Sequence, residues 1–314
     1  MSLPVEALVA QVLAGSHQAA ARLISLVEDG EPEGREALRA LLPHAGRAYT
    51  IGITGPPGAG KSTLVDALTA LLRAEGRQVG IIAVDPTSPF SGGALLADRV
   101  RMQAHATDPG VFVRSMATRG HLGGLAPATG DVVRILDALG CNTILIETVG
   151  AGQGEVDVVS AADTIAVVTV PGLGDAVQML KAGIMEIGDL FVVNKADRPD
   201  AERTVTEISA MLRLAPPGGW QPPVLKTVAL RGEGVGEVLG AIHGHRAYLE
   251  AEGLLAIRRR ERRKAEILRA LQTRISEEVV ARARADGTLE ALVEAVAEGR
   301  LDPHTAAISL LRGI

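Results

Sequence analysis

The run Gly55-Pro-Pro-Gly-Ala-Gly-Lys-Ser62 matches the phosphate-loop pattern G-x-x-x-x-G-K-[ST]. Apolar residues alternate over 49–54, as in a buried strand, and recur at helical spacing over 62–74. In such a loop, backbone N–H groups cradle phosphate oxygens at a helix N-terminus, where the helix dipole favours an anion. The alternative is a glycine-rich turn that matches by chance, but the flanking strand and helix patterns argue against it. The sequence therefore predicts a nucleotide-binding protein.

Two residues of this loop have separate expected tasks. Lys61 is expected to reach the β- and γ-phosphates, and the Ser62 hydroxyl is expected to ligate Mg²⁺. The loop residues that we expect to contact the nucleotide are Gly55, Pro57, Gly58, Ala59, Gly60, Lys61, Ser62 and Thr63.

A second motif, Asn194-Lys-Ala-Asp197, follows an apolar run and so lies at the carboxyl end of a predicted strand, where open α/β sheets bind ligands. The Asp197 carboxylate can accept hydrogen bonds from guanine N1–H and N2–H₂, which adenine does not offer, so the motif favours GTP over ATP. Asn194 can bond the base or neighbouring loops, and the stem of Lys195 can lie along the base. Capping of a following helix by Asp197 or Asp200 is the alternative. Outside the phosphate loop, the expected nucleotide-binding residues are Gly150, Asn194, Lys195, Asp197, Ala229 and Leu230.

Three acidic residues are candidate metal ligands together with Ser62. Asp85 and Asp98 lie in a long segment that begins where a strand-like run ends, and Glu147 ends another such run. Mg²⁺ takes few protein ligands and keeps several waters, so carboxylates here can hold it directly or through water. An Asp-Pro turn at Asp85 and a helix cap at Asp98 are the alternatives. The Gly150 N–H is expected to meet the γ-phosphate.

Composition excludes several classes of protein. The 314-residue chain is 47% hydrophobic, which is ample for a large core, and its net charge of −5 with 2% aromatic residues offers no platform for nucleic acid. The single cysteine, Cys141, excludes an intrachain disulfide and a thiolate metal cluster within one chain. We see neither a leader pattern nor an apolar run of membrane-spanning length, and expect a cytoplasmic protein without membrane or nucleic-acid partners. The alternative is an organellar protein whose targeting segment is absent.

The chain divides into three predicted zones: an N-terminal helical extension (1–48), a nucleotide-binding domain (49–250) and a C-terminal helical region (251–314). The first zone predicts two amphipathic helices separated by 30–34. In the second, strand-like runs alternate with helical patterns, which predicts an α/β fold with a doubly wound, mostly parallel sheet. The predicted strands are 49–54, 79–84, 111–114, 143–146, 164–170, 190–193 and 224–228.

Five blocks make the sequence recognisable: GPPGAGKST (55–63), VDPTSPFSGGALLADRVRM (84–102), RSMATRGHLGGLA (114–126), ETVGAGQGEVDV (147–158) and VNKADRPD (193–200). They closely resemble the methylmalonyl-CoA mutase-associated GTPases. These MeaB-type proteins of the SIMIBI class of P-loop GTPases are related to the methylmalonic aciduria type A protein, and were once labelled ArgK or LAO/AO transport kinases. The resemblance spans residues 5–314.

This resemblance implies a GTPase chaperone of an adenosylcobalamin-dependent acyl-CoA mutase, which governs cofactor loading and release of damaged cofactor. A cobalamin adenosyltransferase is a second implied partner, and GTP or GDP with Mg²⁺ are the implied cofactors. The family also implies switch segments near 85–105, 148–157 and 172–181, and a homodimer formed through the C-terminal helices.

Hydrolysis would use Lys61, Mg²⁺ and backbone amides to stabilise charge on the leaving phosphate, while another residue orients water. Gln153 is the amide candidate for that task and Asp85 the carboxylate candidate. Lys181 is a candidate for additional positive charge. Gln153 and Lys181 could equally be solvated loop residues.

Three other functions fit parts of the sequence. A nickel-type metallochaperone GTPase would need ligands such as His243 and His245. A small-molecule kinase would transfer phosphate to an acceptor other than water, but no acceptor site is recognisable. A nucleic-acid GTPase would use the basic run 258–264, although such a run on a helix is usually a solvated face.

Overall fold

The computed structural model describes residues 4–85, 105, 107–117, 128–148, 161–172, 185–214 and 219–312. The chain divides into two compact units, Met1–Ala256 and Ile257–Ile314.

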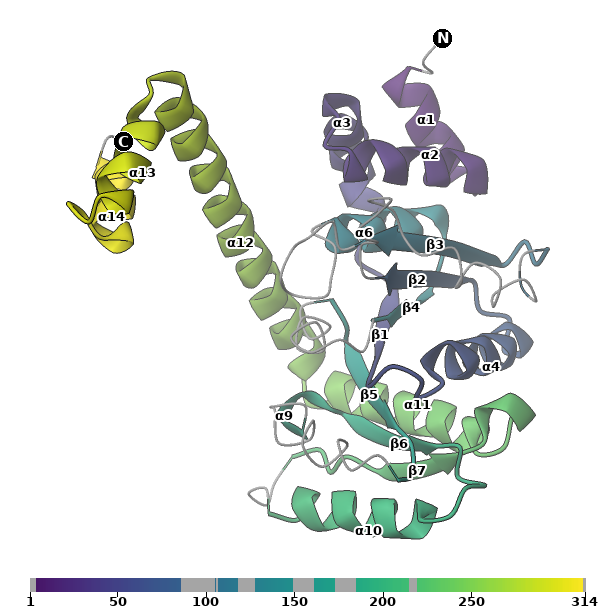
Figure 1. The fold of residues 1–314 in the computed structure, drawn as a ribbon. Coiled ribbons are helices and arrows are strands. Elements are labelled where there is room, and N and C mark those ends of the chain that lie inside the picture. Colours follow the sequence, from purple (N-terminus) through teal and green to yellow (C-terminus); the bar gives the residue numbers. More distant parts are fainter. Residues whose placement is uncertain are drawn as a thin grey trace. The chain divides into compact units, whose positions relative to one another are not determined.

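A seven-stranded sheet forms the centre of the first unit, in the order β3-β2-β4-β1-β5-β6-β7 (Figure 1). Every pairing in it is parallel, so the predicted α/β fold with a doubly wound sheet is confirmed. Parallel strands are covered on both faces, which explains their almost continuous apolar sequences. The strands are β1 (Tyr49–Thr54), β2 (Val79–Asp85), β3 (Val111–Ala117), β4 (Thr143–Glu147), β5 (Thr164–Thr169), β6 (Leu190–Asn194) and β7 (Val224–Thr227).

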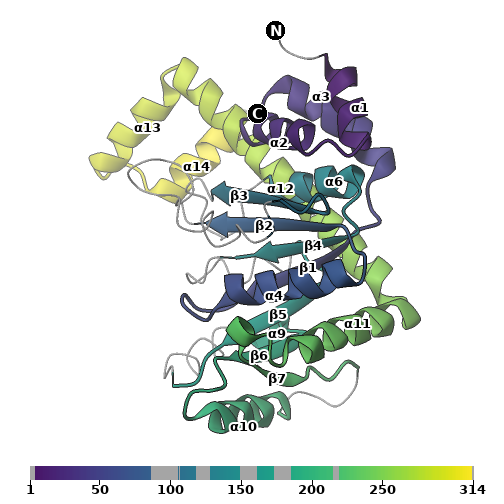
Figure 2. The same ribbon diagram turned by 90° about the vertical axis from the view of Figure 1, so that its right-hand side faces the viewer.

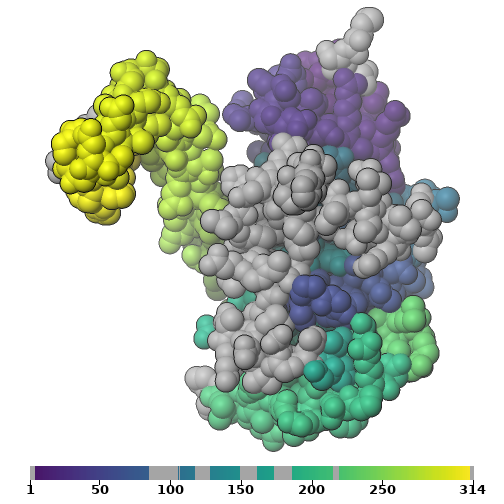
Figure 3. Space-filling model, in the orientation of Figure 1, coloured from purple at the N-terminus to yellow at the C-terminus, as the bar shows by residue number. Residues whose placement is uncertain are grey.

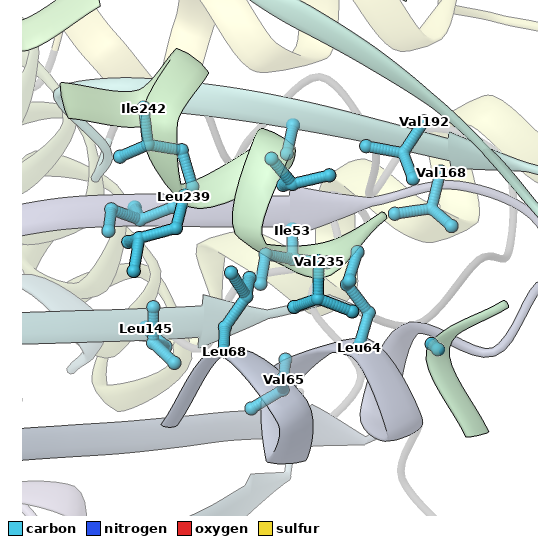
Figure 4. Close-up of a cluster of buried hydrophobic side chains, with 14 of the residues drawn as sticks. Ile53, Leu64, Val65, Leu68, Leu145, Val168, Val192, Val235, Leu239 and Ile242 are labelled. Atoms are coloured by element: carbon cyan, nitrogen blue, oxygen red, sulfur yellow. The ribbon is translucent and has the colours of Figure 1, made fainter. Parts of the chain in front are cut away.

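Helices α4 (Lys61–Ala74) and α11 (Val235–Ala251) lie over one face of this sheet (Figure 2). Their apolar side chains meet strand residues such as Ile53 and Leu145, all buried (Figure 4). Because the side chains of a strand alternate between faces, neighbours of Leu145 in β4 pack on the opposite side. This packing fixes the start of α4, and with it the phosphate loop, against the sheet.

The opposite face carries α6 (Thr129–Leu139) and α10 (Ala201–Leu212), together with the N-terminal helices. The N-terminal zone contains three helices where the sequence predicts two: α1 (Val5–Leu13), α2 (His17–Glu28) and α3 (Pro32–Leu41), followed by the short 3₁₀ helix η1 (Leu42–His44). The expected separator is wrong because Pro32 occupies the first turn of α3, where its missing N–H is not needed. A small helix, α9 (Met185–Ile187), precedes β6, and the 3₁₀ helix η5 (Ala229–Arg231) follows β7.

The second unit holds most of α12 (Leu254–Ala285) and all of α13 (Thr288–Ala297) and α14 (Pro303–Arg312). These helices appear in yellow-green and yellow in Figure 3. Few of their residues are buried, and their exposed large apolar side chains are Ile257, Ile267, Leu268, Leu271, Ile275, Val293, Ile308 and Leu311. In the part of the chain that the structure describes, no helix has the length and apolarity needed to cross a membrane.

Candidate functional site

The phosphate loop joins β1 to α4 at the carboxyl edge of the sheet. Two of its glycines are required by close approach as well as by positive φ. A Cβ atom on Gly55 (φ 135°) would lie 1.9 Å from the Val168 carbonyl oxygen, and one on Gly60 (φ 89°) would lie 2.3 Å from Asn194 Nδ2. A side chain at Gly55 would push the loop away from β5, and one at Gly60 would push it away from Asn194. The tight loop therefore depends on contacts with strands far away in the sequence.

Lys61, the first residue of α4, is buried, and its ammonium group is held by the loop itself. Nζ donates to the carbonyl oxygens of Gly55 at 2.8 Å and Pro56 at 3.0 Å. A buried charge in low-dielectric surroundings interacts strongly with a nearby opposite charge. The loop thus combines a fixed cation with a helix N-terminus, which is the arrangement that a phosphate group requires.

Ser62 and Glu147 meet across the sheet edge. The Ser62 hydroxyl donates to Glu147 Oε1 at 2.6 Å, and Glu147 stands beside Ile53 in the register of β4 with β1. Both side chains offer oxygen ligands, the type that Mg²⁺ prefers. The donor set therefore fits the metal that the sequence analysis assigns to these two residues.

The structure describes the other proposed metal and catalytic residues only in part. Asp85 is the last residue of β2, and its backbone lies at the same carboxyl edge as Glu147, because Ala83 of β2 pairs with Glu147 of β4. Its side chain lies outside the description. Four further predicted residues fall outside the described residues altogether: Asp98, Gly150, Gln153 and Lys181.

Asn194, the last residue of β6, joins three segments through one buried side chain. Nδ2 donates to the carbonyl oxygen of Ala59 at 2.8 Å. Oδ1 accepts from the Thr227 hydroxyl at 3.0 Å and from the Ala229 N–H at 3.1 Å. Of the two uses that the sequence leaves open for Asn194, the structure shows bonding to neighbouring loops. Sequence reasoning missed Thr227, whose only signal is a hydroxyl at the end of a strand.

Lys195 adds a second connection to the phosphate loop. Its Nζ donates to the Gly58 carbonyl oxygen at 2.8 Å, and its backbone has φ 57°, unusual for a residue with a side chain. Such left-handed residues persist where the surrounding structure imposes them, often at functional sites. Here the conformation brings the lysine stem from the end of β6 back over the phosphate loop.

Asp197 and Leu230 both project side chains toward solvent. The Asp197 side chain is 44% exposed and Leu230 is 87% exposed, although Ala229 beside it is buried. Asp197 does not cap a helix, since α10 has Asp200 at its N-cap and no side-chain cap bond there. A carboxylate and an exposed apolar side chain thus follow β6 and β7, the two strands whose ends Asn194 connects.

The histidine pair offered for a metal-binding alternative does not form a site. His245 is fully buried and bonds Thr164 Oγ1 through Nδ1 at 2.8 Å, while His243 is exposed near Glu75. Two residues apart on α11, the two rings point to different sides of the helix. Among the described residues, no group of three or more His, Cys, Asp or Glu side chains is placed to hold a metal ion.

Comparison with known proteins agrees with this geometry. The family model described as "Methylmalonyl Co-A mutase-associated GTPase MeaB" matches residues 20–285. A relative from Pyrococcus abyssi is 51% identical over 314 residues, covering 99% of this chain and 97% of its own. The GTPase ArgK of Escherichia coli is 36% identical, covering 77% and 76%. The mitochondrial methylmalonic aciduria type A homolog of Mus musculus is 31% identical, covering 98% and 79%.

Among solved structures, one described as an LAO/AO transport system kinase superposes with a TM-score of 0.74 at 26% identity, covering 99% of both chains. The match covers nearly the whole chain, and so includes the segments that carry the phosphate loop and Asn194.

Proposed function

The chain belongs to the methylmalonyl-CoA mutase-associated GTPase family, and from this premise we propose that it is the GTPase chaperone of an adenosylcobalamin-dependent acyl-CoA mutase. The protein is a P-loop GTPase. What we propose beyond that is the client, the tasks of individual residues, the metal and the oligomeric state.

One observation carries the nucleotide half of the proposal: Asn194 bonds the phosphate loop, β7 and the turn after it at once. These hydrogen bonds connect the phosphate loop with the loop after β6, on which Asp197 follows, and so support base and phosphate binding at adjoining sites. Adenine has an acceptor where guanine has its donor pair, and so would leave the Asp197 lone pairs that face the base without donors, at a cost of about 1–3 kcal/mol. We therefore propose that Asp197 accepts hydrogen bonds from the edge of guanine, and that Leu230 and the aliphatic stem of Lys195 contact the faces of the ring.

The residues around the phosphate loop have complementary tasks in this proposal. Lys61 supplies positive charge to the phosphates, and Ser62 with Glu147, joined by Asp85, would hold Mg²⁺. When bound, the metal neutralises charge on the phosphate oxygens. Asp85 or Gln153 orients the attacking water, and Lys181 adds positive charge near the leaving group. Backbone N–H groups of the loop hold the phosphates in line for attack.

We further propose that the protein acts in the cytoplasm as a homodimer through its C-terminal helices. Ile267, Leu271 and Ile275 recur every four residues on α12, and all are exposed in the single chain. Such a stripe is buried in most soluble proteins, and a second copy of the same helix supplies a matching surface. Sedimentation at micromolar concentration should give the mass of two chains, and truncation after residue 256 should give a monomer that still binds GTP. A full-length monomer would contradict this part.

The client is tested by GTP hydrolysis with and without an adenosylcobalamin-dependent methylmalonyl-CoA mutase. We expect the mutase to accelerate hydrolysis, because a partner that orders the loops at the carboxyl edge completes the catalytic arrangement. Free phosphate should account for all GTP consumed. Phosphate recovered on another small molecule would instead favour a kinase, and no acceleration by the mutase would remove it as the client. The Lys61→Ala variant provides the background rate.

A further inference from the structure

Arg231, the last residue of η5, lies beside the carboxylate that we assign to the base. Its Nη1 is 3.7 Å from Asp197 Oδ2, and both side chains are about half exposed. The same guanidinium is held by Glu233, with Nε 2.8 Å from Oε1 and Nη2 3.3 Å from Oε2. Because a guanidinium is a rigid planar fork with five donors, contact with Glu233 on one side fixes the direction of the nitrogen that faces Asp197.

The turn that carries Arg231 is closed on itself and attached to the base motif. The Arg231 N–H donates to the Val228 carbonyl oxygen at 2.8 Å, and the Val228 N–H donates to the Glu233 carbonyl oxygen at 3.0 Å. The Ala229 N–H reaches Asn194 Oδ1. Arg231 is therefore presented to Asp197 by backbone hydrogen bonds as well as by Glu233.

We propose that Arg231 is a positioning residue for guanine recognition, which keeps positive charge beside Asp197 while that carboxylate accepts hydrogen bonds from the base. This proposal rests on the proposed role of Asp197. A carboxylate offers about four lone-pair sites, so the arginine and the two guanine donors can be served together. At 3.7 Å the pair is electrostatic, and water weakens it in the open site.

A bound base would remove water from the Asp197 carboxylate. The attraction between the two charges then rises, because it is inversely proportional to the effective dielectric constant. Arg231 thereby offsets part of the desolvation cost of guanine binding. Where residue 197 is neutral, Arg231 offsets no such cost. Substitution of Arg231 should therefore weaken nucleotide binding only when residue 197 is charged.

The test measures the effect of an Arg231 substitution on GDP binding to the wild-type protein and on xanthosine diphosphate binding to the Asp197→Asn variant. Xanthine carries a carbonyl group where guanine has its 2-amino group, so the side-chain amide of Asp197→Asn can donate to it. Titration calorimetry should show that Arg231→Gln weakens GDP binding about tenfold. This lies between the small effect of losing an exposed ion pair and the large effect of losing a buried one, because a bound base shields the pair only in part. In the Asp197→Asn background the same change should alter xanthosine diphosphate binding by less than about twofold.

Two conservative variants refine the test. Arg231→Lys keeps the charge and should retain part of the GDP affinity, whereas Glu233→Gln should lose affinity in the same direction as Arg231→Gln, but less. Arg203→Gln is the matched control, since Arg203 is also an exposed arginine paired with a glutamate, Glu207, at 2.8 Å. It should leave both affinities unchanged.

Equal losses in the two backgrounds would show that Arg231 only shapes the turn, and would overturn the proposal, as would unchanged GDP affinity in Arg231→Gln. Failure of Asp197→Asn to gain xanthosine diphosphate affinity has a different meaning. It would remove Asp197 from the base, and the role of Arg231 would fall with it.

Discussion

The side-chain amide of Asn194 donates to the carbonyl oxygen of Ala59 over 2.8 Å, and so joins the loop after β6 to the phosphate loop after β1. These two segments lie 135 residues apart in the chain. The bond sets the spacing between the proposed base and phosphate sites before a nucleotide binds. A site ordered in advance loses less conformational freedom on binding, and so binds more tightly.

Replacing Asn194 by alanine should therefore weaken GDP binding as well as stability. The change leaves the Ala59 carbonyl oxygen and the Ala229 N–H without their partner, at about 1–3 kcal/mol for each buried group. We expect GDP affinity in calorimetry to fall at least about tenfold. Thr227→Val is the control: it removes one donor but leaves Asn194 bonded to Ala59 and Ala229, so its loss should be clearly smaller. Equal effects would mean that the amide is not the organising group.

Base specificity should change with Asp197. Asp197→Asn should weaken GDP binding and relax discrimination toward xanthosine nucleotides, because an amide can donate to a C2 carbonyl group but accepts through only one atom. Competition binding with GDP, xanthosine diphosphate and ADP measures this directly. Wild-type protein that binds ATP as tightly as GTP would refute the guanine assignment.

The carboxylates that we propose as metal ligands should affect turnover more than nucleotide affinity. Glu147→Gln keeps the size of the side chain and an acceptor for Ser62, but removes the charge that a divalent cation needs. Hydrolysis assayed against Mg²⁺ concentration should show a higher requirement for the metal and a lower maximal rate. Asp85→Ala should act in the same direction, and Lys61→Ala should instead remove affinity that depends on the phosphates. Unchanged turnover in both carboxylate variants would exclude them from the site.

The pair of Arg73 on α4 and Asp108 before β3 makes stability depend on pH. Hydrogen bonds from the Arg73 side chain, at 2.9 Å to each carboxylate oxygen, and from the Gly110 N–H lower the pKa of Asp108 from 3.8 to about 2. A group with a lowered pKa stabilises the fold above its ordinary pKa, and that contribution is lost as the pH falls from about 4 to about 2. Urea unfolding should show Asp108→Asn less stable than wild type at pH 7, with the difference shrinking at pH 3. A constant difference would contradict the ion pair as its source.

Local patterns were sufficient for the sheet and the nucleotide motifs. All seven strands lie close to their predicted ranges. The four central strands β1, β4, β5 and β6 are buried along their whole length and form nearly continuous apolar runs, which makes them easy to predict. The phosphate loop is identified by its glycines and lysine, whereas the partners of Ser62 and Asn194 depend on the strand order that the structure shows. The sequence predicts Glu147 at a strand end, where β4 does end, and the register of β4 with β1 explains its contact with Ser62.

Contacts between distant residues could not be predicted in the same way. Asp137 of α6 accepts hydrogen bonds from the backbone N–H groups of Gly46, Arg47 and Ala48, just before β1. Nothing in the local pattern around either segment signals this contact across about 90 residues. The Arg231–Asp197 pair has the same origin, since it depends on β7 lying next to β6. Polar contacts between exposed residues produce no repeating pattern of apolar residues, so the sequence gives no sign of them.

The measurement that tests the central claim most directly is cobalamin transfer followed by stopped-flow absorbance, with the cognate mutase, its adenosylcobalamin supply and this GTPase mixed at defined nucleotide states. If nucleotide state alters affinity for the mutase, linkage requires that the mutase alter affinity for the nucleotide by the same factor. We predict that replacing GDP by a non-hydrolysable GTP analogue changes the rate or extent of transfer, and that the Lys61→Ala variant abolishes the difference between the two nucleotides. Identical transfer in both states, with a mutase that binds the GTPase, would contradict the account.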